Sequence, residues 1–156
     1  MRKLIYLVSL FFLLLITGVF WGTWFTLTRS IESFSPDEFA HIGRVIIDNV
    51  AIPMRIIMPT GILLVIWSLW ISKQKNGMGF YMGVLSLILI IATLLITVLV
   101  LVPIDNSIKE WTSATIPPDF EIIRNKWKTY HAIRTFISLT SFACFALFIL
   151  RDQNKE

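Results

Sequence analysis

Cysteine is nearly absent from this sequence of 156 residues: Cys144 is the only one, and it lies inside a long apolar run. A single cysteine can form neither an internal disulfide nor a CxxC motif. This argues against a thiol–disulfide oxidoreductase, an activity that some small four-helix membrane proteins have. We expect Cys144 to serve as a small packing residue.

Charged residues are also scarce, at 15% of the chain, whereas hydrophobic residues make up 56%. The apolar residues come in blocks of about 20, which is the length of a helix that spans a bilayer. The net charge of +4 is not gathered in a basic stripe, so we expect no nucleic-acid partner. The expected spans have no charge near their middle, which argues against an ion or proton path through the bilayer. A nucleotide-binding loop, a nucleophile elbow and a metal-binding motif are lacking too.

Four apolar runs predict an all-α fold, an integral multi-pass membrane protein whose four-helix bundle forms a single domain over residues 1–156. The expected spans are residues 4–27, 54–71, 80–102 and 131–150, with outer segments at 29–53 and 103–130. The first run follows two basic residues, as in a signal peptide. It is too long for one, and bulky Trp21 and Trp24 stand where a cleavage site needs small residues, so we predict an uncleaved first span.

Glycine and proline mark the expected helix contacts and helix ends. Gly18 and Gly22 stand four residues apart, a spacing typical of close packing between membrane helices. We expect Pro53 to mark the start of the second span and Pro103 to end the third. Between the first two spans, the run Ser35-Pro36-Asp37-Glu38 predicts a capped helix start. A short amphipathic helix to about residue 49 should follow it.

The distribution of Lys and Arg predicts the orientation in the membrane. Segments 1–3, 72–77 and 151–156 are short and together carry a net charge of +4, whereas the two long segments 29–55 and 103–134 carry eight basic and eight acidic residues. Short flanking segments rich in Lys and Arg stay on the cytoplasmic side. We therefore expect a plasma-membrane protein with both termini in the cytoplasm.

The stretch from Asp119 to Leu150 predicts one long helix, half in lipid and half projecting from it. It follows Pro117-Pro118 and contains neither proline nor glycine. Its 32 residues would span about 48 Å, against a hydrocarbon core of about 30 Å. At 100° per residue, four side chains of its polar half fall within about 80° of one another: Arg124, Trp127, His131 and Arg134.

Most polar residues of interest then lie on one side of the membrane. The helix near residues 36–50, the segment 103–118 and the projecting half of the last helix would form an extended polar cap over the mouth of the bundle. Pockets between bundle helices are common ligand sites. A mouth at the membrane would admit an apolar, lipid-soluble molecule.

His131 is the candidate for proton transfer or metal ligation, and the alternative is a histidine that only forms hydrogen bonds. Arg134 lies near the lipid boundary and needs a partner there. Asp48 or Asp105 could pair with it, or it could hold an anionic oxygen of a ligand. Trp127 could stack on a planar ligand or anchor the helix at the interface.

Two further polar residues of the first outer segment are candidates for the same site. His41 and Asp48 share a helical face and would join His131 only if the two outer helices pack together. Two histidines with a carboxylate could form a metal site. Because the HxH, HxxE and HExxH spacings are lacking, we expect no metal here and assign His41, Asp48 and the more solvated Arg124 to substrate binding.

The segment Val102-Pro103-Ile104-Asp105-Asn106 and the later pattern Arg124-x-x-Trp127-x-x-x-His131-x-x-Arg134 resemble the anthrone oxygenase-like family of small membrane proteins. The resemblance covers nearly the whole chain in layout and is specific at Pro103, Asn106, Trp127, His131 and Arg134. It implies a four-helix membrane fold. Named fungal members oxidise anthrones, which are flat tricyclic phenols, to anthraquinones with no known cofactor. If that activity carries over, Asn106, Trp127, His131 and Arg134 line the site.

Two functions remain open from the sequence. In the first, an oxygenase-like enzyme takes a flat phenolic or quinone-like compound from the bilayer, His131 accepts the phenolic proton, and Arg134 and Asn106 hold the oxyanion. In the second, a non-catalytic membrane protein binds a lipid or a partner, and the outer polar residues only stabilise the cap. We expect no cofactor in either case.

Overall fold

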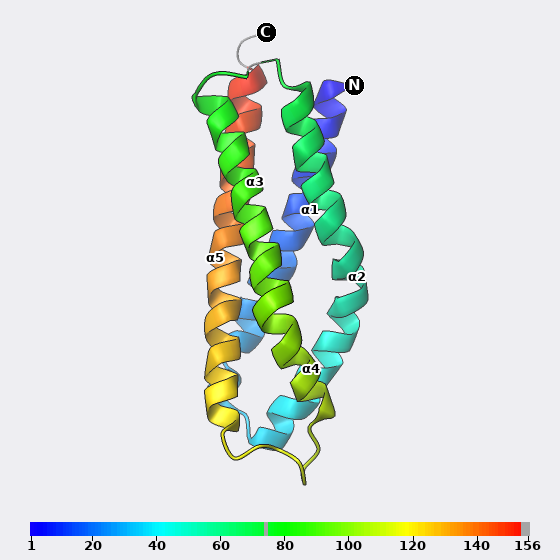
Figure 1. Ribbon diagram of the computed structural model, residues 1–156, viewed down its shortest axis with the longest axis vertical. Coiled ribbons are helices and arrows are strands. Elements are labelled where there is room, and N and C mark those ends of the chain that lie inside the picture. The colour runs from blue at the N-terminus through cyan, green and yellow to red at the C-terminus, as the bar shows by residue number, and fades with distance from the viewer. Residues whose placement is uncertain (74, 154–156) are drawn as a thin grey trace.

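The computed structural model describes residues 1–73 and 75–153. Within them the chain is all-helical, and the elements follow in the order α1 (Arg2–Gly22), η1 (Thr23–Thr28, a π-helical stretch), η2 (Ile31–Ser33), α2 (Pro36–Ile71), α3 (Met78–Ile96), η3 (Thr97–Leu101, also π-helical), α4 (Val102–Glu110) and α5 (Phe120–Gln153). Figure 1 shows an elongated bundle whose two ends of the chain lie together. The last three residues of the predicted polar tail, 154–156, lie outside the described residues.

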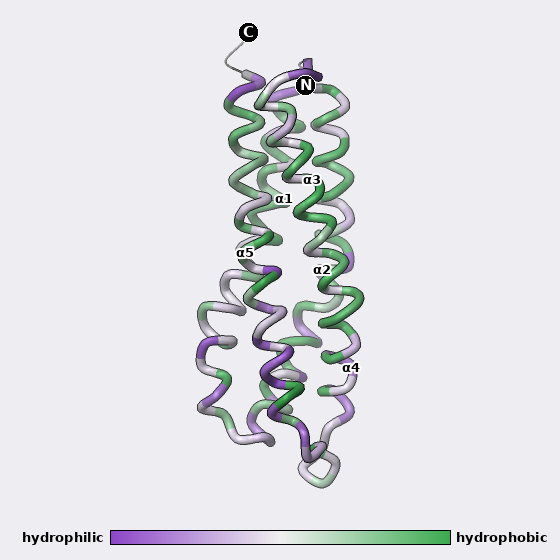
Figure 2. The backbone as a smooth tube through the Cα atoms, turned by 60° about the vertical axis from the view of Figure 1, so that its left-hand side comes forward, coloured by the Kyte–Doolittle hydropathy of each residue, from purple (hydrophilic) through white to green (hydrophobic). Residues whose placement is uncertain are grey.

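Four of the described helical stretches are long and apolar enough to cross a membrane, namely Arg2–Ser33, Pro36–Ile71, Met78–Glu110 and Phe120–Asp152. The predicted all-α membrane bundle of four helices is therefore confirmed. Figure 2 shows apolar backbone along the middle of the bundle, while hydrophilic residues gather at the tip near the termini and over a longer stretch at the other end. This longer polar stretch is the predicted cap, here called the outer end.

The second span differs from its prediction, because the short amphipathic helix and the span are one helix. α2 runs unbroken for 36 residues, with Pro53 and Pro59 inside it. Its start is as expected, since Ser35 and Glu38 form a capping box. A helix broken at Pro53 would leave backbone N–H and C=O groups without hydrogen-bond partners close to lipid. Each such group costs roughly several kcal/mol. The helix therefore continues through both prolines.

The third span also continues past the residue expected to end it. Pro103 stands in the first turn of α4, and the chain stays helical to Glu110. Pro103 directly follows the π-helical stretch η3, where the backbone hydrogen bonds already depart from the α-helical pattern and the Val102 N–H bonds to Thr97 O. The prediction that Pro103 ends the helix was wrong, and α4 presents Asp105 and Asn106 from a regular helix.

Close helix packing occurs at other glycines than the predicted pair. A Cβ atom placed on Gly18 or Gly22 would meet nothing within 4 Å, so this prediction was wrong. A Cβ on Gly83 of α3 would lie 2.6 Å from Leu69 Cδ2 and 3.0 Å from ring atoms of Phe148. The small residue lets α3 approach α2 and α5 closely, which is how small residues act in membrane bundles.

The buried apolar side chains form two clusters. The larger cluster fills the spans between α1, α2, α3 and α5, and the smaller one fills the outer end between η1, η2, the first half of α2, η3, α4 and the start of α5. Trp127 belongs to the outer cluster, together with Phe39 and Trp111. Cys144 is a buried free thiol, as expected of a packing residue.

A polar contact joins three helices near the termini. The buried carboxylate of Asp152 accepts hydrogen bonds from Tyr6 Oη at 2.8 Å and Ser72 Oγ at 2.7 Å, and Arg2 Nη1 lies 3.9 Å from it. These residues come from α1, the end of α2 and the end of α5. The contact holds the inner end of the bundle together, while the outer end is held by its own apolar cluster.

Candidate functional site

The inward face of α5 carries three of the predicted site residues. Trp127, His131 and Arg134 are 2%, 4% and 7% exposed, so the polar groups of the helix are buried at the level where the outer cluster meets the spans. The helix starts at Phe120, directly after the Pro117-Pro118 pair that predicted it. Helical spacing over seven residues then places the three side chains on one face.

His131 and Arg134 contact each other through their polar atoms. Arg134 Nη2 lies 3.0 Å from His131 Nδ1 and 3.4 Å from His131 Nε2. A guanidinium only donates hydrogen bonds, so the nearer imidazole nitrogen must accept one. An imidazole that accepts from a cation is neutral, and its one lone pair is engaged by the guanidinium. His131 can therefore act as a base only once Arg134 Nη2 leaves this nitrogen.

Arg134 lies among groups that do not neutralise it. Its guanidinium carbon is 4.4 Å from the centroid of the Phe20 ring, and Nη1 lies 3.5 Å from Thr97 Oγ1. Its Nε is buried and has no hydrogen-bond partner among the described residues. No carboxylate oxygen of those residues lies within 4.0 Å of this guanidinium. Asp105 interacts with it electrostatically from farther away.

Trp127 links His131 to Asp105. The indole Nε1–H donates to Asp105 Oδ1 at 2.8 Å, and the indole and imidazole rings are 3.7 Å apart between centroids, with 36° between their planes. The Phe39 ring meets the indole edge-on at 5.9 Å. Together with the Phe20 ring beside Arg134, these rings pack apolar faces around the polar groups of the site.

The other predicted site residues lie away from this cluster. Asn106 is exposed on α4, next to the buried-facing Asp105, and His41 is exposed on α2. Asp48 is exposed and forms an ion pair with Lys109, so it is not the partner of Arg134. Arg124 is half-buried and lies 5.2 Å from the Phe120 ring centroid. The catalytic role predicted for Asn106 and the substrate-binding roles predicted for the other three stay predictions.

Sequence reasoning missed three residues of the site, all from other helices. Phe20 of α1 and Phe39 of α2 carry no signal that separates them from the many other phenylalanines of the chain. Thr97 had a weak signal, as a hydroxyl inside the uncharged third span. In the described part of the chain there is no group of three His, Cys, Asp or Glu side chains that could hold a metal ion.

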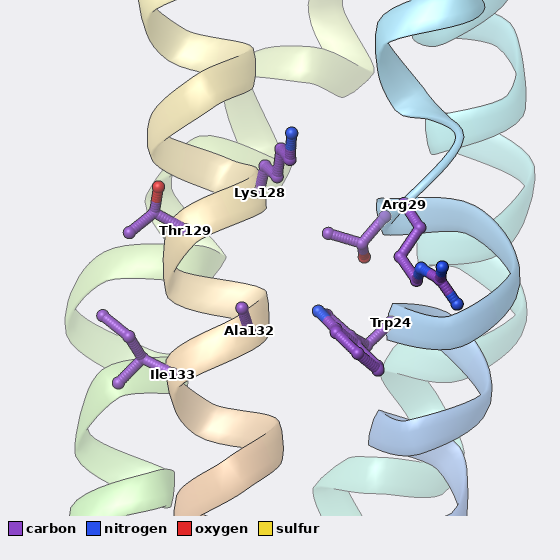
Figure 3. A pocket seen from close by; sticks show the side chains of 7 residues that line it. Trp24, Arg29, Lys128, Thr129, Ala132 and Ile133 are labelled. Carbon is purple, nitrogen blue, oxygen red and sulfur yellow. The ribbon is translucent and has the colours of Figure 1, made fainter.

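A pocket of about 440 Å³ lies beside the site, between η1 and α5. Its lining is mixed, with Trp24, Thr28, Arg29, Lys128, Thr129, Ala132 and Ile133. In Figure 3 the Trp24 side chain lies between the two helices. Along α5, Lys128 and Thr129 lie about one turn from Ala132 and Ile133. Trp127, His131 and Arg134 do not line this pocket, so it is distinct from the buried cluster.

The buried cluster has the groups that a flat phenolic molecule needs. Aromatic rings bind a planar apolar body, a neutral imidazole can accept a proton, and a cation with a free N–H can hold the oxygen left behind. A family model described as anthrone oxygenase matches residues 49–144, which is more than half of the chain. That stretch includes Asp105, Trp127, His131 and Arg134. No curated protein matched the chain, and neither did any solved structure.

Proposed function

Because the chain belongs to the anthrone oxygenase family, we propose that it is an oxygenase-like membrane enzyme acting on a flat, apolar, phenolic or quinone-like compound. The observation that carries the proposal is the buried guanidinium of Arg134. Its Nε–H has no acceptor and no carboxylate is in ion-pair contact with it, among the described residues. A buried cation without an anion is costly, so a substrate oxyanion would supply the missing partner.

The charges of the cluster support proton transfer to His131. When His131 takes the phenolic proton, the site holds two cations, Arg134 and the imidazolium. It then also holds two anions, the new oxyanion and the Asp105 carboxylate. The sum is zero, so that the product of proton transfer is not penalised by a net buried charge. In this structure the imidazole lone pair accepts from Arg134 Nη2. For the transfer, this N–H turns to the substrate oxygen and leaves the lone pair to the phenolic proton.

The deprotonated ring is richer in electrons and reacts more readily with O₂. For an anthrone the balance is one substrate and one O₂ to one anthraquinone and one water. One oxygen atom replaces the two hydrogens of the ring CH₂ group, and the other leaves as water. The ring carbon is oxidised by four electrons, and O₂ is reduced by four. Trp127 and Phe20 hold the flat body while His131 and Arg134 act on its oxygen.

We assign the remaining predicted residues to the path into the site. Asn106 stands one position from Asp105 and lies at the surface, so it would contact the substrate oxygen only as the substrate enters. His41, Asp48 and Arg124 also lie on the outer end. Their contribution is to steer and hold the substrate at the mouth, and each is expected to affect KM more than kcat.

Purified protein in mild detergent tests the proposal. We expect an anthrone added in air to give quinone absorbance, with O₂ uptake in equal amount, faster than in buffer. Heat-denatured protein is the control for surface and trace-metal effects. Absorbance and mass spectra of what co-purifies would identify a bound aromatic compound. Equal rates with native and denatured protein would contradict the proposed activity on anthrones.

We also propose that the protein resides in the plasma membrane with both termini in the cytoplasm, on the distribution of Lys and Arg over the short segments. Cys144 is buried, so new surface cysteines can be labelled over a low background. With a membrane-impermeant maleimide, Ser113→Cys should react in intact cells and Asn76→Cys only after lysis. Both positions are exposed. The reverse pattern would mean the opposite orientation.

A further inference from the structure

The pocket between η1 and α5 lies at the boundary between hydrocarbon and water. α1 has 21 residues and is about 31 Å long, close to the thickness of the hydrocarbon core. η1 follows directly, at the outer boundary. On α5, Ile133 lies 18 residues before Arg151, which is about 27 Å. The pocket therefore opens where lipid headgroups begin.

The side chains around the pocket face lipid. Trp21, Phe25, Ile133 and Phe136 are 41% to 51% exposed, and all are apolar. Trp24 itself packs edge-on against Phe136 at 5.1 Å. An aromatic belt of this kind is typical of the headgroup level. The deeper part of the pocket, at Trp24, Ala132 and Ile133, suits an acyl chain.

The outer rim of the pocket is positively charged. Arg29 is exposed, lies over the Trp24 and Phe25 rings at 5.8 and 5.3 Å, and has no carboxylate partner among the described residues. Lys128 forms an ion pair with Glu32 across the rim. The three side chains leave a net charge of +1. Thr129 also lines the pocket, but its hydroxyl donates to the Asn125 backbone oxygen at 2.9 Å, so the two cations are the groups that would hold a phosphate.

We propose that this pocket binds one anionic phospholipid, with its phosphate between Arg29 and Lys128 and an acyl chain along Trp24, Ala132 and Ile133. The polar rim and the apolar floor follow the order of headgroup and chain along the membrane normal. Glu32 competes with the phosphate for Lys128. The pocket is thus a lipid site beside, and separate from, the buried His131 cluster.

Native mass spectrometry of the full chain with added lipid tests the proposal. Phosphatidylglycerol should bind at least about fivefold more tightly than phosphatidylcholine, the difference expected for about one effective charge at a membrane surface. Arg29→Gln should remove this preference. Glu32→Gln should strengthen phosphatidylglycerol binding, because it frees Lys128. Lys126→Gln, on an exposed position of the same helix, is the matched control and should change nothing.

Several outcomes would contradict the proposed lipid site. Equal binding of the two lipids, or the same loss with Lys126→Gln as with Arg29→Gln, would show only a general surface charge effect. Displacement of the lipid by millimolar inorganic phosphate would mean a free-phosphate site. Displacement by an anthrone would mean that the pocket takes the substrate. If Arg29→Gln does not fold, Glu32→Gln still decides, since a purely structural ion pair predicts no gain in lipid binding.

Discussion

Replacing His131 with alanine is expected to lower the rate of anthrone oxidation by at least about a hundredfold, the low end of what a positioned general base contributes. The hydrogen bond from Arg134 orders the imidazole ring, and the lone pair becomes available for the phenolic proton when the guanidinium turns to the substrate oxygen. Alanine removes the base, and no other histidine of the chain lies in the cluster, because His41 is exposed on α2. Quinone absorbance and O₂ uptake measure the effect.

Two controls separate loss of chemistry from loss of fold. Asn125→Ala changes an exposed side chain on the same helix and should keep the parent rate. His131→Gln fills much of the same volume and can still accept from Arg134, but it is a poor base, so it should be nearly as slow as alanine with the melting temperature of the parent. An anthrone turned over at the parent rate by His131→Ala would rule out this residue as the base.

Arg134→Met is expected to lower kcat by about a hundredfold to a thousandfold, the range measured for removal of one oxyanion donor. Its effect on stability should be small or favourable. The guanidinium is buried, has no close carboxylate among the described residues, and leaves its Nε unpaired. Replacing such a charge with an apolar side chain of similar size is often neutral or stabilising. Activity and thermal melting in detergent are measured together.

Activity and melting temperature together distinguish a catalytic role of Arg134 from a purely structural role of the outer polar residues. A structural role predicts that Arg134→Met melts at a lower temperature and that bound small molecules are unaffected. Because Arg134 also interacts electrostatically with Asp105 from beyond ion-pair distance, Arg134→Met with Asp105→Asn is the matched control of unchanged net charge. A large drop in melting temperature for this double variant, with activity per folded molecule unchanged, would favour the structural role.

Much of this molecule follows from local sequence. Four apolar blocks of membrane length can be satisfied in lipid only as helices, so the fold class needed no tertiary information. The positions of Trp127, His131 and Arg134 on one face of α5 follow from the helical repeat alone. The capping box at Ser35 and the start of α5 after Pro117-Pro118 are equally local, because capping depends on residues a few positions apart.

Prolines and glycines were less predictable, because their effect depends on what surrounds them. Pro53 and Pro103 can each end a helix in water, yet near lipid the helices continue past them, since an open backbone would cost more than a lost hydrogen bond. Gly18 and Gly22 have the spacing of a packing motif, yet a Cβ atom on either would meet nothing within 4 Å, whereas a Cβ on Gly83 would clash with side chains of two neighbouring helices. Spacing alone does not give the rotation of a helix about its axis.

The partners of the site were decided by tertiary structure for the same reason. Asp105 and Asn106 are neighbours in the sequence and point about 100° apart on α4. Only the packing of α4 determines that Asp105 receives the Trp127 indole and that Asn106 faces outward. Side chains of Phe20 and Thr97 reach Arg134 from helices distant in sequence. The sequence by itself determined the helices and the reactive face of α5, whereas the packing between helices decided which groups that face meets.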